Sequence, residues 1–496
     1  MTLIKSISGI RGTIGGAMGD NLTPIDIVKF VTAYVRFLGQ QAPGKRLRVV
    51  VGRDARLSGE MVENVVIGTL LGCGVDVISI GLCTTPGTEM AVTSRKADGG
   101  LILTASHNPK QWNALKMLNH KGEFLGDAEG KQVLAWAEDT SWHYPEIDHI
   151  GRVIERCNFD QEHIDKVLAL KDVNLEAIRQ RKFKVVVDAV NSVGGTVIPS
   201  LLEQMGVEVV RLNCEPTGNF AHNPEPIPEN LTEICSVVVR EKADPGIVVD
   251  PDVDRLALVC QTGEMFGEDY TLVACADYIL SRRGGGNTVS NLSSTRALRE
   301  VTERYGGSYA ASAVGEVNVV TKMKEVGAVI GGEGNGGVIF PELHYGRDAL
   351  VGVALFLSLL AEKGCTMSEL KATYPQFHIS KNKIQLTPDI DVDRVLAVML
   401  NRYTDYNVTD IDGVKIDFPT EWVHLRKSNT EPIIRIYSES RDEDSAERLA
   451  RGIMNEISEI VKAKCKRRPR HTPKHRKRPR RWLPVRSFLC VRWRAD

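Results

Sequence analysis

The chain has 496 residues but no apolar run that approaches the roughly 18–20 residues needed to cross a bilayer. Its first residues, MTLIKSISGIRGTIGG, lack the long apolar stretch and the small-residue cleavage site of a secretory signal. The ten cysteines are scattered and include no CxxC pair, which argues against a disulfide framework or a zinc site. We therefore expect a protein of the cytoplasm, which is a reducing compartment, with no membrane partner.

The chain also lacks a net charge, but its charges are unevenly distributed. Residues 464–496 hold 14 of the 63 lysines and arginines and one of the 63 acidic residues. Such a basic tail could bind nucleic acid or another anionic surface. It could equally be a disordered, solvated tail, or out-of-frame translation past the natural end of the domain. We favour these two interpretations and expect no nucleic-acid partner, because the tail has no helical period and is rich in Pro and Arg.

With 42% hydrophobic and 25% charged residues, the composition is that of an ordinary globular protein. Up to about residue 370, short apolar runs such as LRVVV (47–51) and FKVVVD (183–188) alternate with amphipathic stretches. This pattern predicts parallel strands joined by helices. Beyond Lys371 the runs alternate like antiparallel strands, with two helical segments.

The sequence therefore predicts an α/β protein: three similar mixed-sheet α/β domains followed by a smaller α+β domain. We expect the domains at the following positions: 1–153, 154–255, 256–370 and 371–463, with the basic tail at 464–496.

In each of the three units a polar loop follows a strand, at the edge where open α/β sheets bind ligands. The first loop is TASHNP at 104–109, which places the hydroxyl of Ser106 at the end of a buried strand. A serine in this position could act as a nucleophile. The alternative is an ordinary Ser/Asn turn with no chemical role.

The second loop, DPDVDR at 250–255, carries three carboxylates at alternating positions. In an extended segment Asp250, Asp252 and Asp254 would point to one side and repel one another unless a cation bound them. All-oxygen ligation suits Mg²⁺, and we favour a metal site over a solvated acidic turn because the flanking segments are apolar. In a rival role, one of the aspartates would itself accept a phosphoryl group.

Two further loops could bind a ligand. GGEGNGG at 331–337 is too rich in glycine for the interior of a strand or helix, and it leaves Glu333 and Asn335 to bind sugar hydroxyls. RKSNTEP at 426–432, with Arg435 beyond it, suits a phosphate dianion, although it could be a basic surface turn. The arginines of GIRG (9–12) and GRDAR (52–56) could bind a ligand or form structural salt bridges.

Taken in order, SGIRG, VGRDAR, TASHNP, DPDVDR, GGEGNGG and RKSNTEP resemble the α-D-phosphohexomutase superfamily. The resemblance covers residues 3 to about 462 and is most specific in TASHNP and DPDVDR. It implies four domains around a central cleft. It also implies an intramolecular phosphotransferase, an isomerase of carbohydrate metabolism. Such an enzyme moves a phosphoryl group between the 6- and 1-positions of an aldohexose through a phosphoserine and a bisphosphorylated sugar.

The resemblance implies a role for each candidate residue. Ser106 would carry the phosphoryl group, and an oxygen of its phosphate would complete the Mg²⁺ site of Asp250, Asp252 and Asp254. Three further residues would serve the reacting hydroxyl in catalysis: Arg11, His107 and Lys116. Glu333 and Asn335 would recognise the sugar. The residues that would grip the non-reacting phosphate are Arg426, Ser428, Asn429, Thr430 and Arg435.

Two segments depart from the superfamily pattern. Many members have Ser and His in the sugar loop (GExSGH), where this chain has Asn335 and Gly337, so we expect His344 to fill the vacant role. The usual Asn-Gly after the serine loop is Asn113-Ala114 here.

The GEGNGG loop is similar to that of archaeal-like phosphoglucosamine mutases. We therefore expect a small-molecule sugar phosphate as the partner, and conversion of glucosamine 6-phosphate to glucosamine 1-phosphate. Phosphomannomutase or phosphoglucomutase activity is the alternative.

Overall fold

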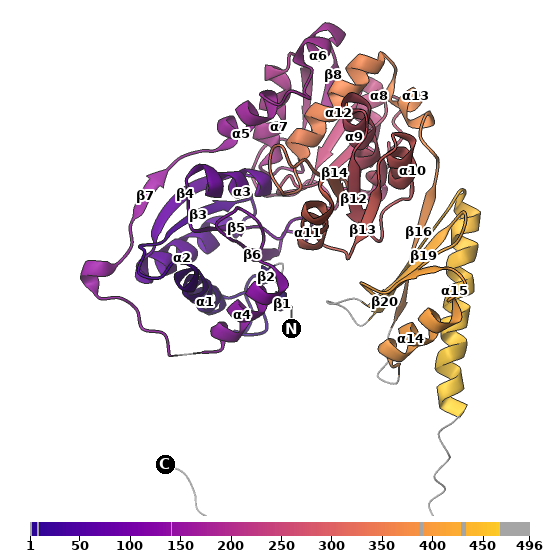
Figure 1. The fold of residues 1–496 in the computed structure, drawn as a ribbon. Coiled ribbons are helices and arrows are strands. Elements are labelled where there is room, and N and C mark those ends of the chain that lie inside the picture. Colours follow the sequence, from indigo (N-terminus) through magenta and orange to yellow (C-terminus); the bar gives the residue numbers. More distant parts are fainter. Residues whose placement is uncertain (1, 7–8, 140, 386–389, 428–432, 467–496) are drawn as a thin grey trace, which may run out of the picture.

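The structure is a computed structural model that describes residues 2–6, 9–139, 141–385, 390–427 and 433–466. These residues form four sheets in chain order, each with its own helices (Figure 1). The expected α/β fold of three similar mixed-sheet domains and a smaller C-terminal domain is confirmed. Within the described residues, no helix combines the length and the apolar character that a membrane span requires.

The first sheet has the strand order β1-β2-β6-β5-β3-β4-β7. Its parallel part consists of β3 (Arg48–Arg53), β4 (Asp76–Leu82), β5 (Gly99–Leu103) and β7 (Val153–Arg156). An antiparallel extension adds β1 (Ile4–Ser6), β2 (Gly9–Thr13) and β6 (Trp112–Leu118). The helices are α1 (Pro24–Gln41), α2 (Gly59–Gly72), α3 (Thr85–Ser94) and α4 (Asp127–Ala137).

The second sheet has the order β11-β10-β8-β9, in which β11 alone runs antiparallel to its neighbour. Its strands are β8 (Lys184–Asp188), β9 (Glu208–Leu212), β10 (Gly246–Val249) and β11 (Leu256–Val259). Its helices are α5 (Asp160–Leu168), α6 (Leu175–Arg181), α7 (Gly194–Gln204) and α8 (Thr232–Glu241).

The third sheet repeats this plan in the order β13-β12-β14-β15, with β15 antiparallel to β14. Its strands are β12 (Asn287–Asn291), β13 (Tyr309–Ser312), β14 (Ala328–Glu333) and β15 (Gly337–Ile339). Its helices are α9 (Glu268–Arg283), α10 (Ala297–Arg304), α11 (Glu316–Val326), α12 (Ala349–Lys363) and α13 (Met367–Ala372).

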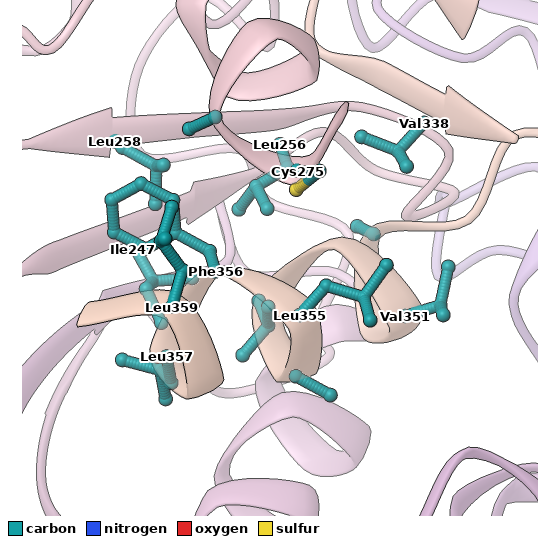
Figure 2. Close-up of a cluster of buried hydrophobic side chains, with 14 of the residues drawn as sticks. Ile247, Leu256, Leu258, Cys275, Val338, Val351, Leu355, Phe356, Leu357 and Leu359 are labelled. Atoms are coloured by element: carbon teal, nitrogen blue, oxygen red, sulfur yellow. The ribbon is translucent and has the colours of Figure 1, made fainter. Parts of the chain in front are cut away.

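Helix α12 joins the second and third domains through one hydrophobic core. Its segment ALVGVALFLSLL is apolar on all sides, and residues 349–360 are all buried, as such a helix requires. It packs against α9 of the third domain and against α5 and α6 of the second. Figure 2 shows Phe356 and Leu359 beside Ile247 and Leu258 of the second sheet. The two domains therefore share their hydrophobic core.

The fourth sheet is antiparallel throughout, in the order β16-β20-β19-β18-β17. Its strands are β16 (His378–Gln385), β17 (Asn407–Thr409), β18 (Val414–Asp417), β19 (Trp422–Lys427) and β20 (Ile433–Ser440), with α14 (Val392–Arg402) and α15 (Glu443–Lys466). Across the border with the third domain, Lys415 Nζ donates to the Leu292 carbonyl at 2.8 Å, and His424 Nδ1 lies 2.9 Å from Ser293 Oγ.

Three expected domain boundaries move once the sheets are seen. Strand β7 pairs with β4, so the first sheet continues past residue 153. Strand β11 pairs with β10, so the second sheet continues past residue 255. Helix α15 reaches Lys466, past residue 463. Strand pairing between distant segments, which local sequence patterns do not reveal, causes the first two shifts.

Candidate active site

The serine loop leaves strand β5 in a strained turn. Ser106 has a φ of 48°, in the left-handed region that L-residues rarely adopt, and its backbone N–H donates to Thr104 Oγ1 at 2.9 Å. Its side chain is 8% exposed, and its Oγ donates to Asp250 Oδ2 at 2.7 Å. Strain of this kind persists only where the surroundings enforce it, and it gathers at functional sites. The hydroxyl is therefore aimed at the aspartate loop of the second domain.

Arg56 enforces this turn, a role that the sequence analysis left open between ligand binding and a structural salt bridge. The guanidinium is 1% exposed and donates to Asp54 Oδ2 at 2.9 Å. Its remaining hydrogens go to backbone carbonyls of the serine loop: Asn108 (2.8 Å), Pro109 (2.9 Å), Trp112 (3.0 Å) and Ser106. One buried arginine thus fixes the path of the serine loop, whereas the side chain of Arg53 donates to Glu63 at 2.7 Å and to the Asp54 carbonyl at 3.3 Å.

His107 lies next to the serine hydroxyl, with Nδ1 at 3.4 Å from Ser106 Oγ. Burial, followed by the nearby Arg255 cation, holds the pKa of His107 well below its ordinary value. The imidazole is therefore neutral at physiological pH, and one of its nitrogens can accept a proton.

Arg11 and Lys116 lie on the same face of the first sheet, because Arg11 of β2 pairs with Ala114, two residues before Lys116 on β6. Lys116 Nζ donates to Asp252 Oδ2 at 2.7 Å. Burial would lower the pKa of Lys116, but the carboxylates of Asp252 and Asp254 outweigh it and raise the pKa. Burial and the Arg255 cation lower the pKa of Arg11. These cations face the aspartate loop from the first domain.

The three aspartates come together, but not in the extended segment that the sequence suggested. They lie in a turn between β10 and β11, in which Val253 has a φ of 64°. All three are completely buried, and one oxygen from each lies within 4.8 Å of the others. The turn, rather than strand alternation, gathers these carboxylates.

The carboxylates leave two oxygens unpaired. Asp250 accepts from Ser106 Oγ and from the backbone N–H groups of Asp254 and Arg255. In contrast, Asp252 Oδ1 and Asp254 Oδ1 are buried without a hydrogen-bond partner. Unsatisfied buried oxygens carry a free-energy penalty that a cation removes. The residues therefore fit a divalent metal ion with oxygen ligands.

The second oxygens of these two aspartates are held from outside the triad. Thr85, at the N-terminus of α3, donates its hydroxyl to Asp252 Oδ2 at 2.6 Å, and Arg347 Nη2 donates to Asp254 Oδ2 at 2.6 Å. Burial and the charges of Asp254 and Asp252 raise the pKa of Asp250 well above its ordinary value. Burial would also raise the pKa of Asp252, but Lys116 and Thr85 lower it. The triad is therefore asymmetric in charge.

The sugar loop is a β-hairpin, so the expectation that its glycines would lie outside strands is wrong. Gly331 and Gly332 belong to β14, and Gly337 begins β15. A Cβ atom on Gly332 would lie 1.9 Å from the Gly337 carbonyl oxygen. Glycine is required there because the two backbones approach so closely.

Glu333, at the end of β14, is 4% exposed and already has several partners. Its Oε1 accepts from Asn291 Nδ2 at 2.9 Å and from the Gly315 N–H at 3.0 Å. Its Oε2 accepts from Arg347 Nη1 at 2.9 Å and from Asn335 Nδ2 at 3.5 Å. The contact to Asn335 is the longest and the easiest to exchange for another donor.

His344, the expected replacement for the missing sugar-loop histidine, is already paired. Its Nδ1 lies 3.3 Å from Glu89 and its Nε2 lies 3.2 Å from Asp348. The space beside Gly337 is instead filled by Arg347, because a Cβ atom on that glycine would lie 2.3 Å from Arg347 Cδ.

The phosphate loop is described at its two ends. Arg426 on β19 and Arg435 on β20 are directly paired across the strands, while Ser428, Asn429 and Thr430 lie outside the described residues. Arg426 Nε lies 2.8 Å from Asp412 Oδ2, which also accepts from the backbone N–H of Val314 at 3.0 Å. The next N–H along the chain, that of Gly315, is bonded to Glu333. Two adjacent amides thus link the phosphate loop to the sugar loop.

Comparison with known proteins identifies the family. Sequence models described as phosphoglucomutase/phosphomannomutase α/β/α domains I, II and III and C-terminal domain match residues 3–143, 161–263, 267–377 and 383–456. The chain belongs to the phosphoglucomutase/phosphomannomutase family, within the α-D-phosphohexomutase superfamily. The resemblance on which the sequence analysis relied is therefore confirmed.

Individual members of this family resemble the chain over most of its length. A phosphoglucomutase/phosphomannomutase of Thermococcus kodakarensis is 36% identical over 441 residues, 88% of this chain and 95% of that protein. A probable phosphoglucosamine mutase of Methanopyrus kandleri is 32% identical over 92% of this chain and 97% of its own length. The crystal structure of a family member from Burkholderia thailandensis superposes with a TM-score of 0.81 at 27% identity, covering 93% of this chain and 98% of that one.

Sequence reasoning missed three residues of this candidate site, namely Thr85, Asn291 and Arg347, and it left the role of Arg56 open. Thr85 carried a usable signal, because the segment Thr84–Pro86 begins two residues after the end of β4, at the same sheet edge as the serine loop. Asn291 likewise ends strand β12. Arg347 had no local signal, since its partners are distant in the sequence.

Proposed function

We propose that the chain is a phosphohexomutase that uses Ser106 to move a phosphoryl group between the 6- and 1-positions of an aldohexose. The observation that carries this proposal is the strained Ser106 hydroxyl, 2.7 Å from Asp250 and aimed at a buried carboxylate triad. Family membership gives the class of reaction, and the geometry supports these residues as the ones that perform it.

In the first step the phosphoryl group leaves Oγ of phosphorylated Ser106 and bonds to a sugar hydroxyl oxygen. The serine P–O bond breaks with its electron pair left on Oγ, which receives the hydroxyl proton. Neutral His107 can relay this proton from its position 3.4 Å from Oγ, while Lys116 and Arg11 contribute positive charge beside the reacting oxygens. The second step reverses these bond changes with the other phosphate of the bisphosphorylated sugar.

We propose that Asp250, Asp252 and Asp254 hold Mg²⁺, because two of their buried oxygens lack a hydrogen-bond partner. A bound Mg²⁺ would supply positive charge to offset that of the transferring phosphoryl group. The hydrogen bonds from Thr85 to Asp252 and from Arg347 to Asp254 would keep these two carboxylates oriented to bind the ion.

The sugar must present each of its two ends in turn to Ser106. This requires phosphate-binding and hydroxyl-binding residues that can hold the sugar in either orientation. Arg426 and Arg435, with Ser428, Asn429 and Thr430 of the same loop, are proposed to hold the phosphate that is not reacting. Glu333 is proposed to accept a bond from a sugar hydroxyl in exchange for its 3.5 Å contact with Asn335.

Glucosamine phosphate is the proposed preferred substrate, since the Methanopyrus relative named as a probable phosphoglucosamine mutase is 32% identical over nearly its whole length and the chain carries the GEGNGG loop. Mannose and glucose phosphates remain the second candidates, because the Thermococcus relative named for them is 36% identical. One polar contact contributes about 0.5–1.5 kcal/mol, so the preference should be roughly tenfold. The cytoplasm stays our prediction for the compartment.

Intact-mass analysis tests the phosphoryl carrier. Wild-type protein incubated with a hexose 1,6-bisphosphate should carry one phosphate, and Ser106→Ala should carry none. Phosphate that persists in Ser106→Ala and disappears in Asp252→Asn would instead support the aspartyl-phosphate alternative. Side-by-side kcat/KM values for glucosamine, mannose and glucose 6-phosphates test the substrate. Faster turnover of mannose or glucose phosphate would refute the preference and leave the mutase reaction standing.

A further inference from the structure

Arg347 connects three carboxylates that belong to three different parts of the active site. Its guanidinium donates from Nη2 to Asp254 Oδ2 at 2.6 Å, from Nη1 to Glu333 Oε2 at 2.9 Å and from Nε to Glu316 Oε2 at 2.8 Å. Asp254 belongs to the metal loop, Glu333 to the sugar loop, and Glu316 to the first turn of α11. Arg347 itself, just before α12, is 9% exposed.

The side chain takes this position only because residue 337 is glycine. A Cβ atom on Gly337 would lie 2.3 Å from Arg347 Cδ and 3.0 Å from its Cγ, closer than non-bonded carbons approach. The backbone of Gly337 is not in the left-handed region, so alanine would cause no backbone strain there; its Cβ atom would clash with Arg347 and lie 3.2 Å from Asn335 Oδ1, a milder contact. Any larger side chain at 337 must therefore displace the aliphatic part of Arg347.

A guanidinium group is needed because the three hydrogen bonds are donated by three different nitrogens held in one plane. The donor hydrogens of a lysine ammonium share a single nitrogen, which cannot reach three carboxylates that are fixed by separate segments. The contact to Asp254 Oδ2 leaves Oδ1 of the same carboxylate without a hydrogen bond. Glu333 stays bonded through its other oxygen to Asn291 and Gly315, so without Arg347 it would still be present but free to turn.

We propose that Arg347 is a positioning residue that sets the metal triad and the sugar loop at the fixed separation that phosphoryl transfer requires. The inference rests on the proposed function, since it assigns Arg347 a purpose within that reaction. It predicts that weakening the contact lowers kcat more than it raises KM. Sugar binding keeps most of its contacts, whereas the alignment of hydroxyl and phosphoryl group is lost.

The test compares Arg347→Lys, Gly337→Ala and the double variant with the wild type. Arg347→Lys retains the positive charge and loses the guanidinium group. Gly337→Ala retains the arginine and displaces the aliphatic part of its side chain. Each single variant should lower kcat about a hundredfold, as misplacement by about 1 Å does. The kcat of the double variant should be no lower than that of the less active single variant, because both changes remove the same contact.

Binding of Mn²⁺ alone, measured by electron paramagnetic resonance, gives a readout that does not depend on turnover. Loss of an outer contact to a metal ligand weakens binding by about 10–100-fold, so Arg347→Lys should bind Mn²⁺ at least about tenfold less tightly. Arg283→Lys is the matched control: Arg283 also joins two carboxylates, Asp172 and Glu342, but neither belongs to the site. It should match the wild type in both measurements.

The outcomes separate the two proposals. Wild-type protein that converts none of the hexose phosphates would refute the proposed function, while the Mn²⁺ comparison would still decide whether Arg347 positions Asp254. Active wild type together with Arg347→Lys of unchanged kcat and unchanged Mn²⁺ affinity would overturn the inference. A lower melting temperature without either change would do so as well, since it would mean that the ion cluster is only structural. Should Arg347→Lys not fold, Gly337→Ala decides by the same two measurements.

Discussion

Arg56→Lys is the change that separates the geometry of the serine loop from its charge. Arg56 donates to the carboxylate of Asp54 and to four backbone carbonyls of the segment around Ser106. Lysine keeps the positive charge near Asp54 but has three donor hydrogens on one atom. At least two of these five acceptors would therefore lose the hydrogen bond that Arg56 donates to them.

The expected effect follows from those lost bonds. A hydrogen bond from a charged donor contributes about 1.5–3 kcal/mol, so losing two destabilises the loop by about 3–6 kcal/mol. Ser106 has a φ of 48° that the surroundings must enforce, and the loop would relax toward an ordinary turn. Displacement of the hydroxyl by about 1 Å should lower kcat about a hundredfold.

The assay combines mutase turnover, phosphate occupancy by intact mass and the thermal unfolding midpoint. Arg53→Lys is the control, because Arg53, at the end of β3 and three residues before Arg56, donates to Glu63 at 2.7 Å and to the Asp54 carbonyl at 3.3 Å, neither of which belongs to the serine loop. We expect the Arg56→Lys variant to be phosphorylated far more slowly than Arg53→Lys and to turn over its substrate far more slowly as well. Equal turnover of the two variants would refute the assignment of Arg56 as the residue that shapes the loop.

Three further predictions concern the triad, a buried histidine and the sugar loop. Asp254→Asn, or excess EDTA with the wild type, should lower kcat at least roughly a thousandfold, since a metal ion contributes several kcal/mol; full turnover in EDTA would contradict this. Burial would lower the pKa of His344, but bonds to Asp348 and Glu89 raise it to about 10. Its stabilising contribution should therefore be complete below pH 6.5 and lost as the pH rises through 10. The gap in melting temperature between wild type and His344→Gln should close over that range, and a gap that widened would show the opposite sign. Asn335→Ala should change KM for the sugar phosphate less than about tenfold and leave kcat nearly unchanged, and a larger fall in kcat would mean that Asn335 takes part in the reaction.

Local patterns in the sequence were sufficient to find the strands that precede the functional loops. The apolar runs before Ser106, Asp250 and Glu333 are buried strands, as their composition indicated. Helix α12 was missed, because a helix that is apolar on all sides has no amphipathic period to detect. Its burial between the second and third domains explains why it carries no polar face.

The sequence by itself determined which chemical groups the site contains and in which order they occur, because these are properties of short loops. Only the tertiary structure decided how they are held. The turn at Val253 replaced the extended arrangement expected for the aspartates, and Arg347 occupied the space that Gly337 leaves. The backbone carbonyls that Arg56 holds lie about 50 residues along the chain, and Arg347 lies 93 residues from Asp254. Contacts between such distant segments depend on strand pairing within a domain and on packing between domains, which no local spacing of residues records.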